Sequence, residues 1–230
     1  MYAGQTGNQG DRSRVWLCPT GVFTHLPLHA AGIYKGSTAE SCSGRAIFSY
    51  TPTLTSLLKA RARTTPIRVA DAKVLLAAAP KPFKWTALPF AAEEVNIARS
   101  TIPSSAIIDL MDSNTSRSDY RSSSAQVEKV LEKLPEASIV HLACHGYHDP
   151  QSPLNSGFVL NEMLSVSQLM SLDLPHAFFA CLSACETAKS DVAQPDEAIH
   201  LAATMLFAGF KSVIATMWYD LNGIFPTYVG

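Results

Sequence analysis

Charged side chains are scarce in this sequence, and their signs nearly cancel. Asp, Glu, Lys and Arg make up 16% of the 230 residues, and the formal net charge at pH 7 is -1. Without a surplus of positive charge, the chain lacks the overall field that draws proteins to nucleic acids or anionic membranes. Hydrophobic residues reach 47%, which is typical of a well-packed globular protein with little disorder. We therefore expect neither a nucleic acid nor a membrane as a partner.

Long apolar runs and a cysteine framework are also missing. No apolar run approaches the roughly 20 residues that a membrane-spanning helix needs. Residues 1–14 are polar and Gly-rich, without the apolar core of a secretion signal. The five cysteines are an odd number and lack the spacing of a disulfide framework. These features predict reduced thiols and a reducing compartment, which means a cytoplasmic or nuclear location.

Strand and helix patterns alternate along the chain after a loose tail at residues 1–13. We expect strands at 14–17, 45–50, 73–79, 106–110, 138–143, 158–160, 177–183 and 211–218, and helices at 53–63, 90–101, 127–134, after 165 and at 195–207. Thr53 is the expected N-cap of the first helix, and Ser123 with Gln126 and Ser165 with Gln168 have capping-box spacing. There is no internal repeat. The alternation predicts one α/β domain over residues 14–230, with a parallel or mixed sheet and helices on both faces.

Two motifs place reactive residues where apolar runs stop. They are HLACHG at 141–146 and LSACET at 182–187. The carboxyl ends of parallel strands meet at one edge of a sheet, where ligands bind. About 40 residues separate His145 from Cys185, which is close to the length of a strand–helix–strand excursion. We therefore expect the two residues to lie close together, and a thiol beside an imidazole is the minimum for cysteine-based acyl transfer.

The chemistry assigns a role to each of these residues. An imidazole can take the proton of the thiol, because the thiolate is the nucleophile, and can return that proton to a leaving amine. Gly146 follows His145 directly and allows backbone to approach a substrate closely. The N–H groups of Gly146 and Cys185 are the expected donors to the oxyanion, each worth roughly 3 kcal/mol of barrier.

Other readings of the same residue types stand beside this one. Cys144 and Cys181 are expected to fill the core, and His141 to be a satisfied core histidine. A zinc site is a rival, since His141, Cys144, His145 and Cys185 are all possible ligands. However, neither CxxC nor a helical HxxxH is present, and His141 and Cys144 have opposite parity on one strand. We favour the Cys–His pair and expect no metal and no cofactor.

At these residues the chain resembles the CHAT domain, a caspase- and separase-like peptidase family. The closest resemblance is to the fungal group in which the domain usually follows TPR repeats. The family has His-Gly after one strand and Ser-Ala-Cys-Glu/Gln-Thr after a later one, here at 145–146 and 183–187. The likeness extends over residues 14–220 and includes CPTG at 18–21, DEAIHLAA at 196–203 and IATMW at 214–218.

The resemblance implies a caspase-like three-layer α/β fold, in which helices flank a mostly parallel central sheet. It implies peptidase chemistry with His145 as general base and acid, Cys185 as nucleophile, and the amides of Gly146 and Cys185 as the oxyanion hole. It implies a protein or peptide substrate, with TPR-type repeats or other signalling proteins as further partners. Asp220 is the candidate carboxylate for selecting Arg or Lys before the scissile bond, and a solvated loop aspartate is the alternative.

The chain also departs from the family pattern. Ser190-Asp191 stands where a Gly-Asp turn usually follows the cysteine motif, and the final long helix expected after Trp218 is not recognisable. We therefore expect a domain truncated at its C-terminus, which leaves part of one sheet face uncovered. Three functions remain in view: a cysteine endopeptidase, a catalytically inactive signalling or interaction module, and a zinc-dependent hydrolase.

Overall fold

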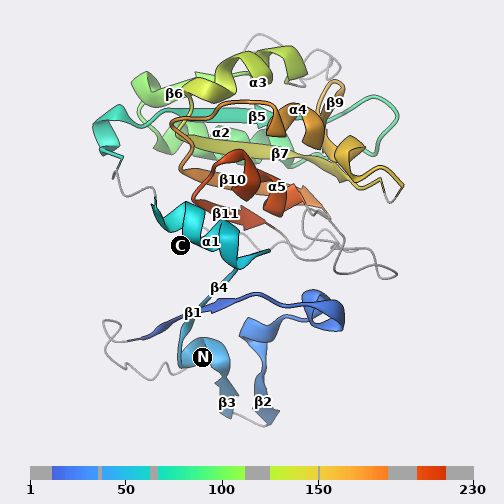
Figure 1. The fold of residues 1–230 in the computed structure, drawn as a ribbon. Coiled ribbons are helices and arrows are strands. Elements are labelled where there is room, and N and C mark those ends of the chain that lie inside the picture. The colour runs from blue at the N-terminus through green and yellow to red at the C-terminus, as the bar shows by residue number, and fades with distance from the viewer. Residues whose placement is uncertain are drawn as a thin grey trace.

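A mostly parallel sheet forms the centre of the protein (Figure 1). The computed structural model describes residues 12–35, 38–62, 67–111, 125–149, 151–185 and 201–215. Five parallel strands lie in the order β11-β10-β7-β5-β6, and two short antiparallel strands, β8 and β9, extend from β7. These strands are β5 (Val74–Ala78), β6 (Ile107–Asp109), β7 (Ile139–Tyr147), β8 (Gly157–Val159), β9 (Met163–Ser165), β10 (Phe179–Cys185) and β11 (Ser212–Ala215).

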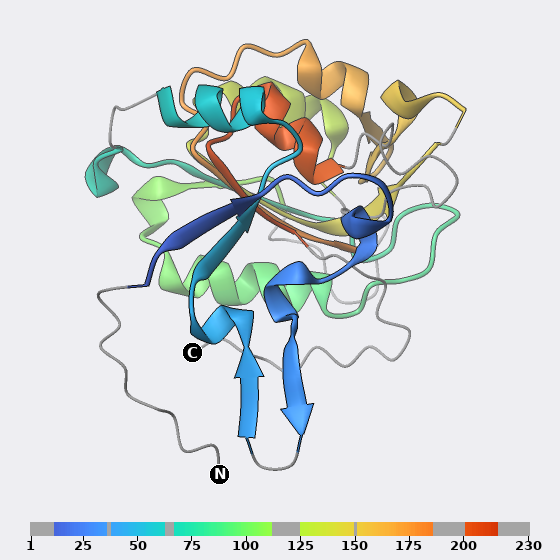
Figure 2. The same ribbon diagram turned by 60° about the horizontal axis from the view of Figure 1, so that its bottom comes forward.

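Helices cover both faces of this sheet, as the alternating pattern predicts. Figure 2 shows α2 on one side, and α1, α3, α4 and α5 on the other. Their bounds are α1 (Leu54–Ala62), α2 (Ala91–Thr101), α3 (Val127–Lys133), α4 (Val166–Met170) and α5 (Leu201–Ala208). The mixed α/β architecture with its mostly parallel sheet is consistent with the caspase-like fold that the sequence predicts.

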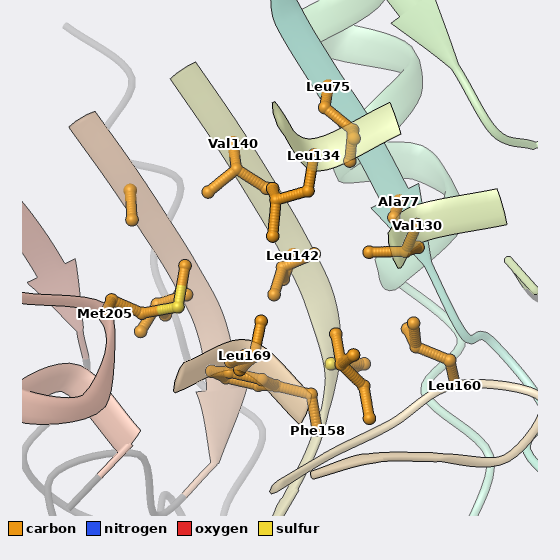
Figure 3. Packing of buried hydrophobic residues seen from close by; sticks show 14 of the residues in the cluster. Leu75, Ala77, Val130, Leu134, Val140, Leu142, Phe158, Leu160, Leu169 and Met205 are labelled. Carbon is orange, nitrogen blue, oxygen red and sulfur yellow. The ribbon is translucent and has the colours of Figure 1, made fainter. Parts of the chain in front are cut away.

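The larger hydrophobic core lies on the face covered by α3, α4 and α5. Leu142 in the middle of the sheet, Phe158 of β8 and Met205 of α5 are all at least 99% buried and belong to this cluster (Figure 3). Burying side chains of this size contributes about 1.5–3 kcal/mol each. All five residues of β5 are buried, as expected for a parallel strand covered on both faces.

Alternation along β7 decides which side chains reach which face. Val140, Leu142 and Cys144 belong to the larger core, whereas Ala143 packs into the smaller core with Val95 of α2. Side chains two residues apart point to the same face of a strand. His141 and His145 therefore share the face of Ala143, which is the face covered by α2.

Local polar contacts start and stop the helices where the sequence indicates. Thr53 Oγ1 accepts a hydrogen bond from the Ser56 N–H at 3.0 Å, so Thr53 caps α1 as predicted. Ser165 and Gln168 form the predicted capping box at α4. Gly209, with φ of 120°, follows the end of α5. Ser123 lies outside the described residues, but the N-cap of α3 is Gln126, without a side-chain hydrogen bond, so the predicted capping box of Ser123 with Gln126 is wrong.

Residues before α1 form two small strand pairs beside the β11 edge of the sheet (Figures 1 and 2). Strand β1 (Arg14–Leu17) pairs in parallel with β4 (Ile47–Tyr50), and β2 (Gly32–Lys35) pairs antiparallel with β3 (Thr38–Ser41). The sequence predicts β1 and β4 but not β2 and β3. Single 3-10 turns lie at Gly21–His25, Leu28–Ala30, Cys42–Gly44, Val69–Asp71, Ser104–Ala106, Leu134–Glu136 and Pro153–Asn155.

The helices of the described segments are short. The longest, α2, has 11 residues, and none of the helices in these segments has the length and apolarity required to cross a bilayer.

Candidate active site

His145 lies in β7, on the face of the sheet that α2 covers. The apolar pattern of the sequence predicts that this strand ends near Ala143, but β7 continues to Tyr147. This extension arises because β8 folds back beside the last part of β7, where His145 pairs with Val159 and Gly146 pairs with Phe158. The predicted end of the strand near Ala143 is therefore wrong, because β7 pairs with β10 as far as His145 and with β8 as far as Tyr147.

A main-chain carbonyl holds the His145 ring. The Nε2 atom lies 2.7 Å from the carbonyl oxygen of Thr86, which accepts the hydrogen bond because a carbonyl has no proton to give. Nε2 therefore carries the proton. In the neutral ring, Nδ1 is then the nitrogen that can accept a proton. This contact supplies the third, orienting member that a nucleophile–base pair requires.

The loop between β5 and α2 supplies both this carbonyl and an aromatic wall. Trp85 stacks against the His145 ring with 5.5 Å between centroids and a 30° tilt, and meets Tyr147 edge-on at 5.9 Å. The preceding residue, Lys84, has a left-handed backbone with φ of 64°, uncommon outside glycine. The N–H of Leu88 donates to the carbonyl of Pro80 at 2.7 Å and so closes the loop on itself.

Cys185 is the last residue of β10 and the register partner of His145. Neighbouring strands lie about 4.8 Å apart, so the backbones of the two residues are adjacent. The predicted meeting of these two strand ends is confirmed at the level of backbone register. The side chain of Cys185 lies outside the described residues, and its role as nucleophile stays a prediction.

The remaining predicted site residues have different outcomes. Gly146 lies inside β7, next to His145, and its part in an oxyanion hole stays a prediction. Asp220, the candidate for substrate selection, and the final helix expected after Trp218 fall outside the described residues. Cys144 is fully buried in the larger core, as predicted.

A second polar cluster lies further down the same two strands. His141 Nε2 is 3.1 Å from Glu94 Oε1 of α2, and Cys181 of β10 is the register partner of His141. Burial alone would lower the pKa of His141, but the neighbouring Cys181 and Glu94 side chains outweigh it and raise this pKa to about 9. His141 is therefore a largely buried histidine with a carboxylate partner, and the sequence interpretation did not include the charge that this partner favours.

The carboxylate in this cluster is also perturbed. Burial acts to raise the pKa of Glu94, but the neighbouring side chains of His141 and of Ser183 of β10 outweigh it, and the pKa falls below its usual 4.5. The sequence does not distinguish Glu94 from its exposed neighbour Glu93, because both are glutamates in the same helical turn. Cys181, on the neighbouring strand, is only partly buried, so the prediction that it fills the core is wrong.

The alternative of a zinc site finds no support in the arrangement of ligands. Within the segments that the structure describes, no three His, Cys, Asp or Glu side chains are grouped so as to hold a metal ion. Cys144 packs in the larger core, on the opposite face from His141 and His145, because strand parity separates them.

Comparison with known proteins shows a family relationship. A protein-family model described as the CHAT domain matches residues 3–219. A comparison with curated proteins gave no match.

Proposed function

The chain belongs to the CHAT domain family, which is related to caspase-like cysteine peptidases, and we propose that it is a cysteine endopeptidase with Cys185 as nucleophile and His145 as general base and acid. The observation that carries this proposal is the register pairing of these two residues at the edge of the sheet. The hydrogen bond between His145 Nε2 and the Thr86 carbonyl adds the orienting contact of a three-membered catalytic unit.

The proposed reaction follows from the hydrogen bond that places a proton on Nε2 of His145 and leaves Nδ1 as the acceptor. Nδ1 takes the proton of the Cys185 thiol, and the thiolate attacks the peptide carbonyl carbon to form a C–S bond. The imidazolium then gives its proton to the leaving amine as the C–N bond breaks. Water, activated by the same ring, hydrolyses the thioester and restores the thiol. The hydrogen bond to Thr86 holds the ring through both proton transfers.

Stabilisation of the tetrahedral intermediate is assigned to main-chain donors. The N–H groups of Gly146 and Cys185 belong to neighbouring strands whose pairing ends at the His145–Cys185 position. A main-chain donor to the oxyanion contributes roughly 3 kcal/mol to lowering the barrier. Gly146 lacks a Cβ, so a substrate carbonyl can approach its N–H closely.

Aromatic side chains beside His145 suggest where a peptide lies. Trp85 is 38% exposed and Tyr147 37% exposed, and the two rings are in contact. Partly exposed aromatic rings bury large areas when they bind a ligand. We propose that they contact the peptide next to the scissile bond. Asp220 remains the proposed carboxylate for Arg or Lys selection.

A peptide probe that reacts with catalytic thiols tests the proposal. The wild-type chain, Cys185→Ala, His145→Ala and the control Cys18→Ala are incubated with an acyloxymethyl ketone peptide library, and labelled sites are mapped by mass spectrometry. We expect labelling at Cys185 to fall at least 100-fold in His145→Ala and to be unchanged in Cys18→Ala. Equal labelling of Cys185 in wild type and His145→Ala would refute the assignment of the base.

A non-catalytic interaction module is the second candidate, and the exposed apolar side chains of one segment favour it. Phe23, Leu26, Ile33 and Tyr34, all from residues before α1, are between 46% and 63% exposed. Exposed apolar side chains of this size are available to contact a partner protein. Under this alternative Cys185→Ala changes neither the partners captured by the chain nor the phenotype. A cellular protein that is processed with the wild type and stays intact with Cys185→Ala would reject it.

A further inference from the structure

The chain contains two thiol–imidazole pairs on one strand pair. Cys181 and His141 are register partners on β10 and β7, four residues before Cys185 and His145. At a rise of about 3.3 Å per residue, the two pairs are about 13 Å apart along the strands. The proposed peptidase reaction uses only the outer pair, so the inner pair has no assigned role.

Glu94 completes the inner pair to a thiol–imidazole–carboxylate group. Its Oε1 lies 3.1 Å from His141 Nε2, and the Ser183 hydroxyl contacts the same carboxylate. The His141 side chain is 13% exposed, which restricts its motion. Nucleophile, base and orienting carboxylate are the members of an activated cysteine site.

The groups around His141 favour its cationic form. Glu94 faces it from α2 and Cys181 from β10, while its register partner on β5 is the apolar Leu76. Burial opposes the charge, but the contacts with Cys181 and Glu94 raise the pKa of His141 to about 9. A cysteine beside a cationic group is the type that reacts as a thiolate.

Small molecules can reach the inner pair from the β11 side. Cys181 is partly exposed, and its register partner on that side, Ile214 of β11, is 61% exposed. Cys144, one position before His145 on β7, is by contrast fully buried on the other face.

We propose that Cys181 is a second reactive thiol of this chain, a site at which peroxides and small alkylating electrophiles modify the protein, and that His141 and Glu94 activate it. With a peroxide, the Cys181 sulfur attacks one oxygen, the S–O bond forms as the O–O bond breaks, and the leaving hydroxide takes a proton to become water. Sulfur is oxidised by two electrons to a sulfenic acid and the peroxide is reduced. With iodoacetamide, an S–C bond forms and iodide leaves.

The modified thiol is not expected to form a disulfide with Cys185. A disulfide needs Cα atoms 4.4–6.8 Å apart, and residues four apart on one extended strand are about 13 Å apart. Cys185 therefore does not consume the sulfenic acid, which is available for reduction by an external thiol or for chemical trapping.

Alkylation rates measured at each cysteine test the proposal independently of peptidase activity. The full chain, as wild type and as Cys185→Ala, is treated with limiting iodoacetamide at pH 6.5, and each cysteine is quantified by peptide mapping. The exposed Cys18 serves as the reference thiol. We expect Cys181 to react at least tenfold faster than Cys18 in both proteins. Hydrogen peroxide followed by dimedone is expected to label Cys181 in the same samples.

Variants of the activating residues complete the test. We expect His141→Asn and Glu94→Gln to slow alkylation of Cys181 at least fivefold, and the matched variant Glu93→Gln on the same helix to leave it unchanged. The buried Cys144 reports unfolding, because it is alkylated only when the core opens. A Cys181 rate at or below that of Cys18 in the wild type, or an unchanged rate in folded His141→Asn and Glu94→Gln, would overturn the proposal.

Discussion

Replacing Glu94 with Gln is expected to destabilise the protein in a pH-dependent way that replacing Glu93 with Gln does not. Both residues lie in the first turn of α2, but Glu93 is exposed, whereas Glu94 contacts His141. Each substitution removes one negative charge from the same helix end, so the effect on the helix dipole is matched. The difference between the two variants therefore isolates the contact with His141.

The magnitude follows from the shift at His141. Raising its pKa from 6.5 to about 9 corresponds to about 3 kcal/mol of preference for the cation. Cys181 shares in this shift, and the Glu94 side chain is 39% exposed and therefore screened by solvent. We assign about 1–2 kcal/mol to Glu94 at neutral pH. For a domain of this size, that is about 2–8 °C in melting temperature.

Two titrating groups, His141 and Glu94, determine how the stability contribution depends on pH. The folded-state pKa of His141 is raised, so its contribution is complete below pH 6.5 and is lost as the pH rises through about 9. The pKa of Glu94 is lowered, so its contribution is complete above pH 4.5 and is lost as the pH falls through the folded-state value. The gap between Glu94→Gln and Glu93→Gln is therefore widest between about pH 5 and pH 8.

Urea unfolding followed by circular dichroism at pH 3–10 measures this gap. The wild type, both single variants, His141→Asn and Glu94→Gln/His141→Asn are compared at each pH. In the His141→Asn background, Glu94→Gln is expected to cost little further stability, because the two residues act as one unit. Equal stabilities of Glu94→Gln and Glu93→Gln at pH 7, or a gap that persists undiminished at pH 10, would refute the reasoning.

Two further predictions concern the framework that positions the site. Leu142→Ala removes a side chain that is 1% exposed and is expected to lower the free energy of unfolding by about 2–5 kcal/mol. Leu54, at the start of α1, is 66% exposed, and Leu54→Ala is expected to cost less than about 1 kcal/mol. Equal urea midpoints for the two variants would contradict the packing. Gly157→Ala places a Cβ 2.2 Å from the Leu164 carbonyl oxygen, so β8 and β9 must separate, whereas Gly44→Ala meets nothing within 4 Å. We expect a fall in melting temperature for Gly157→Ala at least 5 °C larger than for Gly44→Ala, and similar falls would disprove the close approach.

The sequence predicts the sheet and the meeting of His145 with Cys185, because buried strands are visible as apolar runs and parallel strands end at a common edge. It also predicts helix starts wherever a side chain forms the cap, as at Thr53 and Ser165. It does not predict the contact of Glu94 with His141, since strand parity assigns a residue to a face but does not identify which helix residue lies opposite.

Features that depend on the path of the backbone could also not be predicted from the sequence. Strand β7 continues past His145 only because β8 folds back on it, and the strands β2 and β3 are four-residue elements without a strong alternating pattern. The residue type at Thr86 is irrelevant to the contact with His145, because the peptide carbonyl makes it. Side-chain types alone do not reveal such an acceptor.

That peptide carbonyl has a consequence for how the proposed activity can be gained or lost. Any amino acid at position 86 supplies the same oxygen, so substitutions there leave the acceptor in place as long as the path of the main chain is kept. A shortened or lengthened loop would displace it while leaving both His145 and Cys185 intact. A relative could then lose the activity through a changed number of residues between Pro80 and Pro89. The residue types of its catalytic side chains would be unchanged.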